Sequence, residues 1–263
     1  MIHCAGKAGV WGPYRDFYRA NVLASQNLLE ASRRAGVRRF LHFSSPSVYF
    51  DFRDQLNLRE EDLPSRPADH YARTKLESER IVLAAHAARF RTLAFRPRLV
   101  IGAGDRNVLP RLISLQRAGK LFDIGSPEVR VSVTSVGNLL HAVDCALLAP
   151  DSAYGEVYNL ADAEPVLLRA LVDQVLGEFG LPRRRRRLPR ALMLPLARLN
   201  ERLCRWAGVR EEPRLLPVPI AVLSQSMTLN IDKARARLGY SPEDRLGREI
   251  RDFAESVPGC WGG

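Results

Sequence analysis

Arg39-Phe-Leu-His-Phe-Ser-Ser-Pro-Ser47 (residues 39–47) is an apolar run that ends in serine hydroxyls. A short apolar run bounded by serine and proline predicts a buried strand, here over residues 38–43. Ser44 and Ser45 then fall at the carboxyl end of the strand, which is the edge where open α/β sheets bind ligands. The segment therefore predicts a parallel sheet with a functional site at this edge.

The segment Tyr71-Ala-Arg-Thr-Lys75 places a phenol and an ammonium group four residues apart. On a helix, positions i and i+4 share a face, so both side chains can point into one cleft. A free tyrosine has a pKa near ~10, and a neighbouring ammonium lowers that pKa toward the range useful for general acid–base catalysis. Such a pair is common on solvated helices, and the strand serines give it weight because a serine can bind the reacting oxygen.

Strands and helices are expected to alternate along the rest of the chain. We predict strands at residues 2–5, 38–43, 91–96, 129–133 and 156–160, and helices at residues 15–34, 71–88, 105–120 and 135–148. Alternation of this kind is typical of βαβ units that build a parallel sheet.

Several segments together resemble one enzyme family. They are Ile2-His-Cys-Ala-Gly-Lys-Ala-Gly-Val-Trp-Gly-Pro13, Asn21-Val22 with Asn27-Leu-Leu-Glu-Ala31, Phe43-Ser-Ser-Pro-Ser-Val-Tyr-Phe50, His70-Tyr-Ala-Arg-Thr-Lys75, Phe95-Arg-Pro-Arg-Leu-Val-Ile-Gly-Ala-Gly-Asp105 and Ile231-Asp-Lys-Ala-Arg-Ala-Arg-Leu-Gly-Tyr240. The chain is similar to the extended short-chain dehydrogenases/reductases, in the branch of 3β-hydroxysteroid dehydrogenases and bacterial 2-alkyl-3-oxoalkanoate reductases. The resemblance covers nearly the whole chain in the family's order.

The resemblance implies an α/β fold, a Rossmann-like doubly wound parallel sheet that is N-terminally truncated and carries a smaller C-terminal substrate lobe. Residues 1–164 would form the partial dinucleotide-binding domain, residues 106–128 would contribute to the substrate lobe, and residues 165–263 would supply most of that lobe. The implied activity is an NAD(P)-dependent interconversion of a 3-hydroxy and a 3-oxo group on a hydrophobic substrate, either steroid-like or a long-chain 3-oxo acid. A sugar-nucleotide epimerase or dehydratase and a cofactor-deficient, non-catalytic remnant are the alternatives.

The resemblance also implies which residues act. Tyr71 would be the catalytic acid/base, Lys75 would bind the nicotinamide ribose and tune the tyrosine, Ser45 would bind the substrate oxygen, and Asn21 would belong to the active-site relay. The cofactor, NAD or NADP, would be held by Ala5, Gly6, Lys7, Tyr71, Lys75, Arg96 and Pro97.

The family's opening glycine-rich turn has no counterpart where it is expected. Met1 falls almost on what resembles the fourth strand, so roughly 60 residues of the usual mononucleotide-binding half are missing. Gly6-Lys-Ala-Gly-Val-Trp-Gly12 spells G-x-x-G-x-x-G, but Pro13 and Tyr14 follow it, and Glu30, the next acidic candidate, lies in a predicted helix. We therefore expect no pyrophosphate turn here, and an exposed sheet edge at residues 2–5. A mis-assigned start codon, a genuine truncation that leaves a weak or dead enzyme, and completion by a partner stay open.

Cysteines and histidines give no sign of disulfides or metal. Cys4, Cys145, Cys204 and Cys260 are far apart, and the five histidines lack ligand spacing. Isolated thiols are typical of a reducing compartment. The spacing of the histidines and cysteines therefore predicts no bound metal. No signal peptide and no apolar run of ~18 residues is present, so we predict a cytoplasmic protein.

The net charge of +11 is nearly all arginine and is concentrated at Arg183-Arg-Arg-Arg-Arg187. This run favours a solvated basic turn, and without interleaved aromatic residues it predicts no nucleic-acid partner. Residues 188–206 then carry leucines at helical spacing, interrupted by Pro189 and Pro195. We interpret them as a lid helix whose apolar face lines a pocket for a hydrophobic ligand, and peripheral membrane contact through residues 183–206 is compatible with that. A homodimer stays open.

Overall fold

A four-stranded parallel sheet forms the centre of the computed structural model, which describes residues 1–182 and 187–256. Its strands are β1 (Ile2–His3), β2 (Arg39–Phe43), β4 (Arg91–Pro97) and β9 (Val157–Leu160), in the order β1-β2-β4-β9. Every neighbouring pair is parallel. The predicted α/β architecture with a parallel sheet is confirmed.

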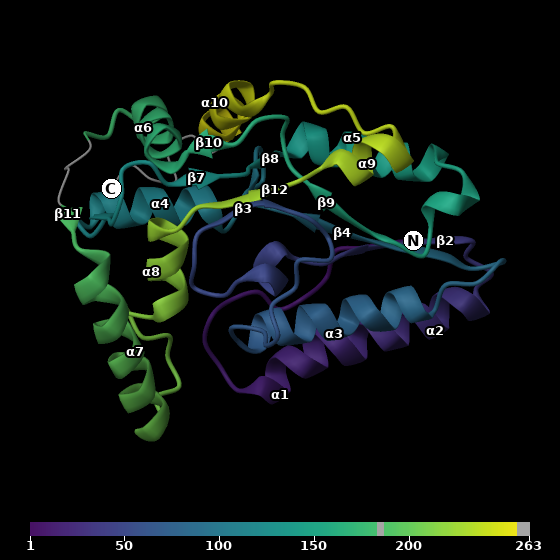
Figure 1. Ribbon diagram of the computed structural model, residues 1–263, viewed down its shortest axis with the longest axis horizontal. Helices are drawn as coiled ribbons and strands as arrows, with labels where there is room; N and C mark the ends of the chain where they lie inside the picture. Colours follow the sequence, from purple (N-terminus) through teal and green to yellow (C-terminus); the bar gives the residue numbers. More distant parts are fainter. Residues whose placement is uncertain (183–186, 257–263) are drawn as a thin grey trace.

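Helices cover both faces of this sheet (Figure 1). One face carries α1 (Tyr14–Phe17), the π-helix η1 (Tyr18–Leu23), α2 (Ala24–Arg34) and α3 (His70–Ala84). The other carries α5 (Val136–Leu148) and α9 (Asp232–Leu238). The predicted helix over residues 15–34 is confirmed, except that its middle takes π-helical form. The predicted end of the next helix at Ala88 is wrong, because Ala87 and Phe90 form a tight turn that lets Phe90 pack into the core.

A second sheet lies beside the first, in the order β10-β7-β12-β3. It consists of β3 (Gln55–Leu58), β7 (Arg130–Val131), β10 (Val166–Leu167) and β12 (Met227–Leu229). Two short pairs accompany it, β5 (Val100–Ile101) with β8 (Thr134–Ser135) and β6 (Asp123–Ile124) with β11 (Arg187–Leu188). Strands from the first and the last third of the chain therefore share one sheet.

The remaining helices complete the fold of the described residues. They are η2 (Pro46–Tyr49), α4 (Val108–Arg117), η3 (Asp151–Ala153), α6 (Leu168–Glu178), α7 (Arg190–Trp206), α8 (Pro217–Ser224) and α10 (Leu246–Ser256). Within the described ranges, no helix is long and apolar enough to cross a bilayer.

Several predicted elements are longer than the observed ones. The strand expected at residues 2–5 ends at His3, because the chain then turns so that Lys7 N donates to Asn21 Oδ1 at 2.7 Å. The strand expected at residues 129–133 ends at Val131. There the Ser132 hydroxyl accepts a hydrogen bond from the backbone N–H of Leu229. The helix expected at residues 105–120 begins at Val108, since the Asp105 carboxylate caps its first turn.

Helix α7 confirms the predicted helix over residues 188–206, but its apolar face is not where we expected it. Met193, Leu194 and Ala197 pack against the cluster around Ile124 and Ile220. The other apolar side chains of the helix are solvent-exposed, namely Leu192, Leu196, Leu199, Leu203 and Trp206. The expectation that this face lines a pocket is therefore wrong. Residues 183–186 of the basic run, and Cys260, lie outside the described residues.

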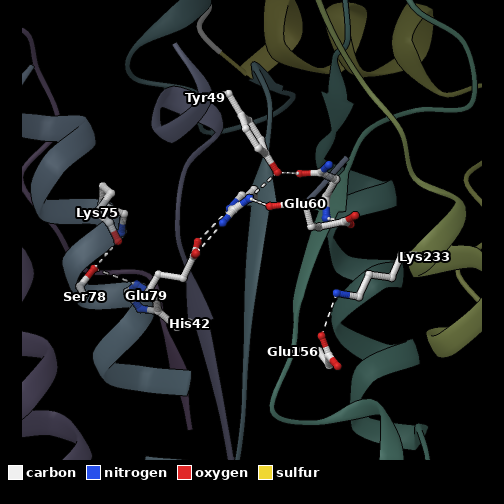
Figure 2. A network of polar contacts seen from close by, with 10 residues as sticks. His42, Tyr49, Glu60, Lys75, Ser78, Glu79, Glu156 and Lys233 are labelled. Carbon is white, nitrogen blue, oxygen red and sulfur yellow. Dashed lines mark hydrogen bonds and ion pairs between the residues drawn. The ribbon is translucent and has the colours of Figure 1, made fainter. Parts of the chain in front are cut away.

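A buried arginine connects the two sheets and the helix α3. The Arg96 guanidinium donates to the Glu79 carboxylate at 2.9 and 2.5 Å, to the carbonyl oxygen of Glu60 at 2.9 Å, and to the Tyr49 hydroxyl. Glu60 in turn accepts the backbone N–H of Asn159 in β9 at 2.8 Å. Figure 2 shows Tyr49, Glu60 and Glu79 converging from three different segments. One guanidinium therefore fixes β4 against α3, η2 and the loop after β3.

Replacing Arg96 tests this connection. Arg96→Met leaves the Glu79 carboxylate, which is 3% exposed, buried without its partner. We expect a loss of about 3–5 kcal/mol in the free energy of unfolding, measured with urea. The double variant with Glu79→Met is expected to lose less than the sum of the single variants, because neither charge is then left alone.

The matched control is Arg34→Met, which breaks an i,i+4 pair with Glu30 whose side chains are 72% and 66% exposed. That change is expected to cost about 0.5 kcal/mol or less. Equal losses at Arg34 and Arg96 contradict the structural role of the buried pair.

Candidate functional site

The serines after β2 lie at the carboxyl end of the sheet, as the sequence predicted. Ser44 N donates to Phe95 O at 2.7 Å, which extends the pairing of β2 with β4 by one bond. Ser45 then begins η2, and its hydroxyl accepts the N–H of Ser47 at 3.2 Å. Pro46 at the first helical position makes the chain turn here. The turn leaves Ser45 at the strand end, and its side chain reaches Tyr71.

Tyr71 sits in the first turn of α3, which Asp69 caps by accepting the N–H of Ala72 at 2.7 Å. Burial raises the pKa of the Tyr71 phenol, a hydrogen bond with the Ser45 side chain lowers it, and the charge of Asp69 raises it again. Lys75 is not among the groups that act on this pKa. The expectation that Lys75 lowers the pKa of Tyr71 is therefore not met, and desolvation is the larger effect.

Lys75 lies one turn further along α3 and reaches the same strand end. Its ammonium donates to the carbonyl oxygen of Phe43 at 2.5 Å. Burial lowers the pKa of Lys75 to about 8, against the opposing charges of Glu79 and Cys4. An ammonium has three N–H donors. The group therefore keeps donors for a ligand beyond the Phe43 carbonyl.

Asn21 holds the loop after β1 against α3. Its amide accepts from Lys7 N at 2.7 Å and donates to Lys7 O at 3.1 Å and to Thr74 Oγ1 at 3.0 Å. Asn21 lies in η1, and local π-helical turns are frequent at functional sites. The buried amide thus links the β1 loop with the helix that carries Tyr71.

Gly6 shows why this loop fits a flat ligand group. A Cβ at Gly6 would stand 3.0 Å from Asn21 Oδ1 and 3.9 Å from Lys75 Nζ. Ala5 and Gly6 are exposed, and Lys7 is half-buried. An open backbone beside an ammonium and an amide suits the hydroxyls and ring of a nicotinamide ribose. The residues present therefore fit that end of a dinucleotide.

Gly6, Gly9 and Gly12 are the glycines of the segment that we do not expect to form a pyrophosphate turn. They lie in the loop between β1 and α1, Gly9 and Gly12 have φ of 128° and 129°, and α1 begins only at Tyr14. Glu30 lies inside α2. The rejection of G-x-x-G-x-x-G as a fingerprint stays a prediction. β1 lies at one end of the strand order, as expected.

Arg96 and Pro97 were predicted to touch the cofactor. The Arg96 guanidinium is instead engaged by Glu79, Tyr49 and Glu60, so its side chain serves the core. Pro97 ends β4 opposite Leu160. A contact from the backbone of these two residues stays a prediction.

Sequence reasoning missed the polar support behind the site. Thr74 Oγ1 accepts from Asn21 and donates to His70 O at 2.9 Å, a role that no spacing indicated. Glu79 could have been found, since it continues the i, i+4 series from Tyr71 through Lys75. Behind Lys75, the Ser78 hydroxyl donates to Lys75 O at 2.9 Å and lies 3.2 Å from His42 Nε2 (Figure 2).

The fold and the site define a member of the short-chain dehydrogenase/reductase class. Residues 1–190 match the 3-beta hydroxysteroid dehydrogenase/isomerase family, and the chain belongs to this family. A 2-alkyl-3-oxoalkanoate reductase from Stenotrophomonas maltophilia (strain K279a) is 32% identical over 262 residues, which are 97% of this chain and 79% of the reductase. The 3beta-hydroxysteroid-dehydrogenase/decarboxylase isoform 1 from Arabidopsis thaliana is 34% identical over 269 residues, 97% of this chain and 61% of that protein.

A solved structure supports the fold. UDP-glucuronic acid 4-epimerase from Bacillus cereus, in complex with NAD, superposes with a TM-score of 0.71 at 22% identity, covering 97% of this chain and 72% of the epimerase. The predicted Rossmann-like fold is confirmed. At the level of the family, the predicted class of NAD(P)-dependent oxidoreductase for 3-hydroxy and 3-oxo groups is confirmed as well.

The Lys75 ammonium should impose a pH dependence. Lys75 is charged below its pKa of about 8 and neutral above it. We expect kcat/KM for ketone reduction to be level below this pH and to fall by about tenfold per pH unit above it, because kcat/KM reports the free enzyme. Lys75→Arg keeps its charge throughout, so its falling limb should disappear even if its maximal rate is lower. Two results would contradict this assignment. One is a wild-type profile in which kcat/KM does not fall at high pH, and the other is a Lys75→Arg profile that falls as the wild-type profile does.

Proposed function

We propose that this chain reduces the 3-oxo group of a hydrophobic substrate to a 3-hydroxy group, and catalyses the reverse reaction, with NADH or NADPH as the reductant. The observation that carries the proposal is the juxtaposition of the Tyr71 phenol and the Ser45 side chain at the end of β2. Lys75 and Asn21 stand behind the same strand end, around the open backbone of Gly6. A carbonyl oxygen between Tyr71 and Ser45 has two hydroxyl donors.

Tyr71 acts as the acid in the reductive direction. Because burial raises the pKa of Tyr71, the phenol is protonated at neutral pH. The bound dinucleotide supplies the hydride to the carbonyl carbon. Ser45 orients the substrate oxygen through a hydrogen bond, and Tyr71 transfers its hydroxyl proton to that oxygen as negative charge develops on it.

Lys75 and Asn21 position the reductant rather than the substrate. Lys75 has N–H donors beyond the one used by the Phe43 carbonyl and can reach ribose hydroxyls. Asn21 holds the backbone at Lys7, so that the chain beside Gly6 stays open. The contacts of Ala5, Gly6 and Lys7 with the cofactor belong to the proposal.

Replacing Tyr71 by phenylalanine tests the acid. Tyr71→Phe removes the transferable proton and keeps the ring, so we expect kcat to fall by about 10²- to 10⁴-fold while NAD(P)H still binds. Turnover is followed by NAD(P)H absorbance with a hydrophobic 3-oxo acid, and binding by NAD(P)H fluorescence. Tyr18→Phe is the matched control and should keep wild-type turnover.

The same assay separates the alternatives. Conversion of UDP-glucuronic acid or UDP-glucose without turnover of the 3-oxo acid favours the epimerase alternative. Absence of NADH and NADPH binding at millimolar concentration favours the cofactor-deficient remnant. Either result contradicts the proposed reduction.

We also propose that α7 contacts an anionic membrane surface. Leu192, Leu196, Leu199, Leu203 and Trp206 are 56%, 45%, 55%, 55% and 89% exposed. At 100° per residue, these five side chains share one narrow face of the helix. Arg198 and Arg202 are exposed beside it. Leucine and tryptophan flanked by arginine are typical of helices that lie in a lipid interface.

The position of α7 suits the delivery of a hydrophobic substrate. Figure 1 shows α7 extending from the body beside α8. Its carboxyl end meets the loop after β1, since the Arg205 guanidinium lies 4.8 Å from the Trp11 ring and Trp11 Nε1 donates to Val209 O at 3.2 Å. The charge of Arg205 also acts on Asp69 at the start of α3. Contact through α7 would bring the Tyr71 site close to the lipid.

Vesicle sedimentation tests the contact. Leu199→Glu with Leu203→Glu should weaken binding to phosphatidylserine vesicles by about tenfold or more, because two exposed leucines that would enter the lipid are replaced by charges. Leu148→Glu, at a leucine that is 86% exposed on α5, is the control and should bind normally. Wild type that does not bind vesicles and is dimeric in solution, together with a monomeric double variant, would instead show that a second copy of the chain covers this face.

A further inference from the structure

Arg98 is a buried arginine whose guanidinium lacks an acidic partner. Its residue is 6% exposed, and its Nε atom is buried without a hydrogen-bond partner. Throughout residues 1–182 and 187–256, no carboxylate lies within ion-pair distance of it. Two residues earlier, Arg96 is equally buried but is engaged by Glu79, Tyr49 and Glu60. The core therefore satisfies one arginine and leaves the next one unpaired.

The backbone of Arg98 is held firmly at the carboxyl edge of the sheet. Arg98 N donates to Thr134 Oγ1 at 3.0 Å, and Thr134 Oγ1 donates back to Arg98 O at 2.9 Å. Arg98 N also lies 3.3 Å from Leu160 O, which continues the pairing of β4 with β9 beyond Pro97. The guanidinium is therefore unpaired although the residue itself is well anchored.

The strand register places Arg98 near the Tyr71 site. Phe43 pairs with Phe95, so Ser44 and Ser45 follow β2 at the level of Arg96 and Pro97, and Arg98 comes one residue further along. Side chains of a strand alternate between the two faces, so Arg98 shares the face of Arg96, which is the face that α3 covers. Tyr71 begins that helix above the same edge.

Other buried polar atoms without partners belong to segments at this edge. They are Ser44 Oγ, Ser47 Oγ, Gln55 Oε1 and both amide atoms of Gln225. Gln55 N donates to Ser226 O at 2.9 Å, and Gln55 Nε2 donates to Tyr49 O at 3.0 Å, so these segments are in contact. Buried polar groups are normally satisfied, so this collection points to a polar ligand group.

We propose that Arg98 binds the carboxylate of a 3-oxo acid whose ketone is reduced at Tyr71. The inference rests on the proposed function and names its substrate class and its specificity-determining residue. In a 3-oxo acid, one carbon separates the ketone from the carboxylate, so the two groups need recognition sites close together. Tyr71 and Ser45 recognise the first, and Arg98 recognises the second through paired N–H donors.

The electrostatics of Arg98 suit a negative ligand. Burial alone lowers the pKa of Arg98 to about 10, with no neighbouring acid to raise it, and the guanidinium is still charged at neutral pH. A buried charge without a partner is unfavourable, and an incoming carboxylate removes that unfavourable state. The name of one relative, a 2-alkyl-3-oxoalkanoate reductase, describes a protein that acts on such an acid.

The test compares a long-chain 3-oxo acid with its methyl ester, which has the same ketone without the charge. Wild type should prefer the acid in kcat/KM by about 10- to 100-fold, the size of a lost charge-assisted hydrogen bond. Arg98→Gln should abolish this preference, so that the ratio of kcat/KM for the acid to kcat/KM for the ester falls to about one. Arg98→Lys should keep part of the preference, and Arg130→Gln, at an exposed arginine in β7, should keep all of it.

A binding measurement keeps the proposal testable without turnover. Calorimetry with the long-chain 3-hydroxy acid and its methyl ester should show the same preference in wild type and its loss in Arg98→Gln, whose folding is checked by thermal denaturation. If wild type has equal kcat/KM for acid and ester, or binds the 3-hydroxy acid and its ester with equal affinity, the role of Arg98 is overturned. Reduction of the ester alone also overturns it but retains the proposed function, whereas failure to reduce either compound overturns the proposed function.

Discussion

The ion pair between Arg96 and Glu79 determines where α3 lies on the sheet. Both groups are almost completely buried, and separating them would leave two charges without solvent or partner. Glu79 follows Lys75 by one turn and Tyr71 by two, so the helix cannot slide or rotate without disturbing this pair. The distance from the Tyr71 phenol to Ser45 therefore depends on a contact that takes no part in the chemistry.

The same arginine extends this constraint to the second sheet. Its contacts with Tyr49 and with the Glu60 carbonyl fix the segments that lead into and out of β3, and β3 pairs with β12 from the far end of the chain. Arg98 continues the same strand, but among residues 1–182 and 187–256 its guanidinium has no acidic partner. The contrast separates a buried charge that holds the scaffold from one that we propose to bind a ligand.

Much of the fold and part of the site could be predicted from the sequence. Apolar runs and alternation gave the parallel strands, and the i, i+4 spacing gave Tyr71 and Lys75 because helix geometry fixes which side chains meet. Asn21 was predicted only from the family resemblance, because its amide forms hydrogen bonds with a loop and a helix that lie far apart in the sequence. The direction of the Tyr71 pKa shift was wrong because burial depends on tertiary packing. Arg96 and Arg98 look alike in the sequence, and only their surroundings distinguish them.

The central claim is that Tyr71, Ser45, Lys75 and Asn21 surround a carbonyl that receives a hydride from a nicotinamide. Isotope transfer tests it most directly. With NADH or NADPH deuterated at the transferring carbon of the nicotinamide ring, the 3-hydroxy product should carry deuterium on its carbinol carbon. An unlabelled product, or deuterium at any other carbon, would contradict the account.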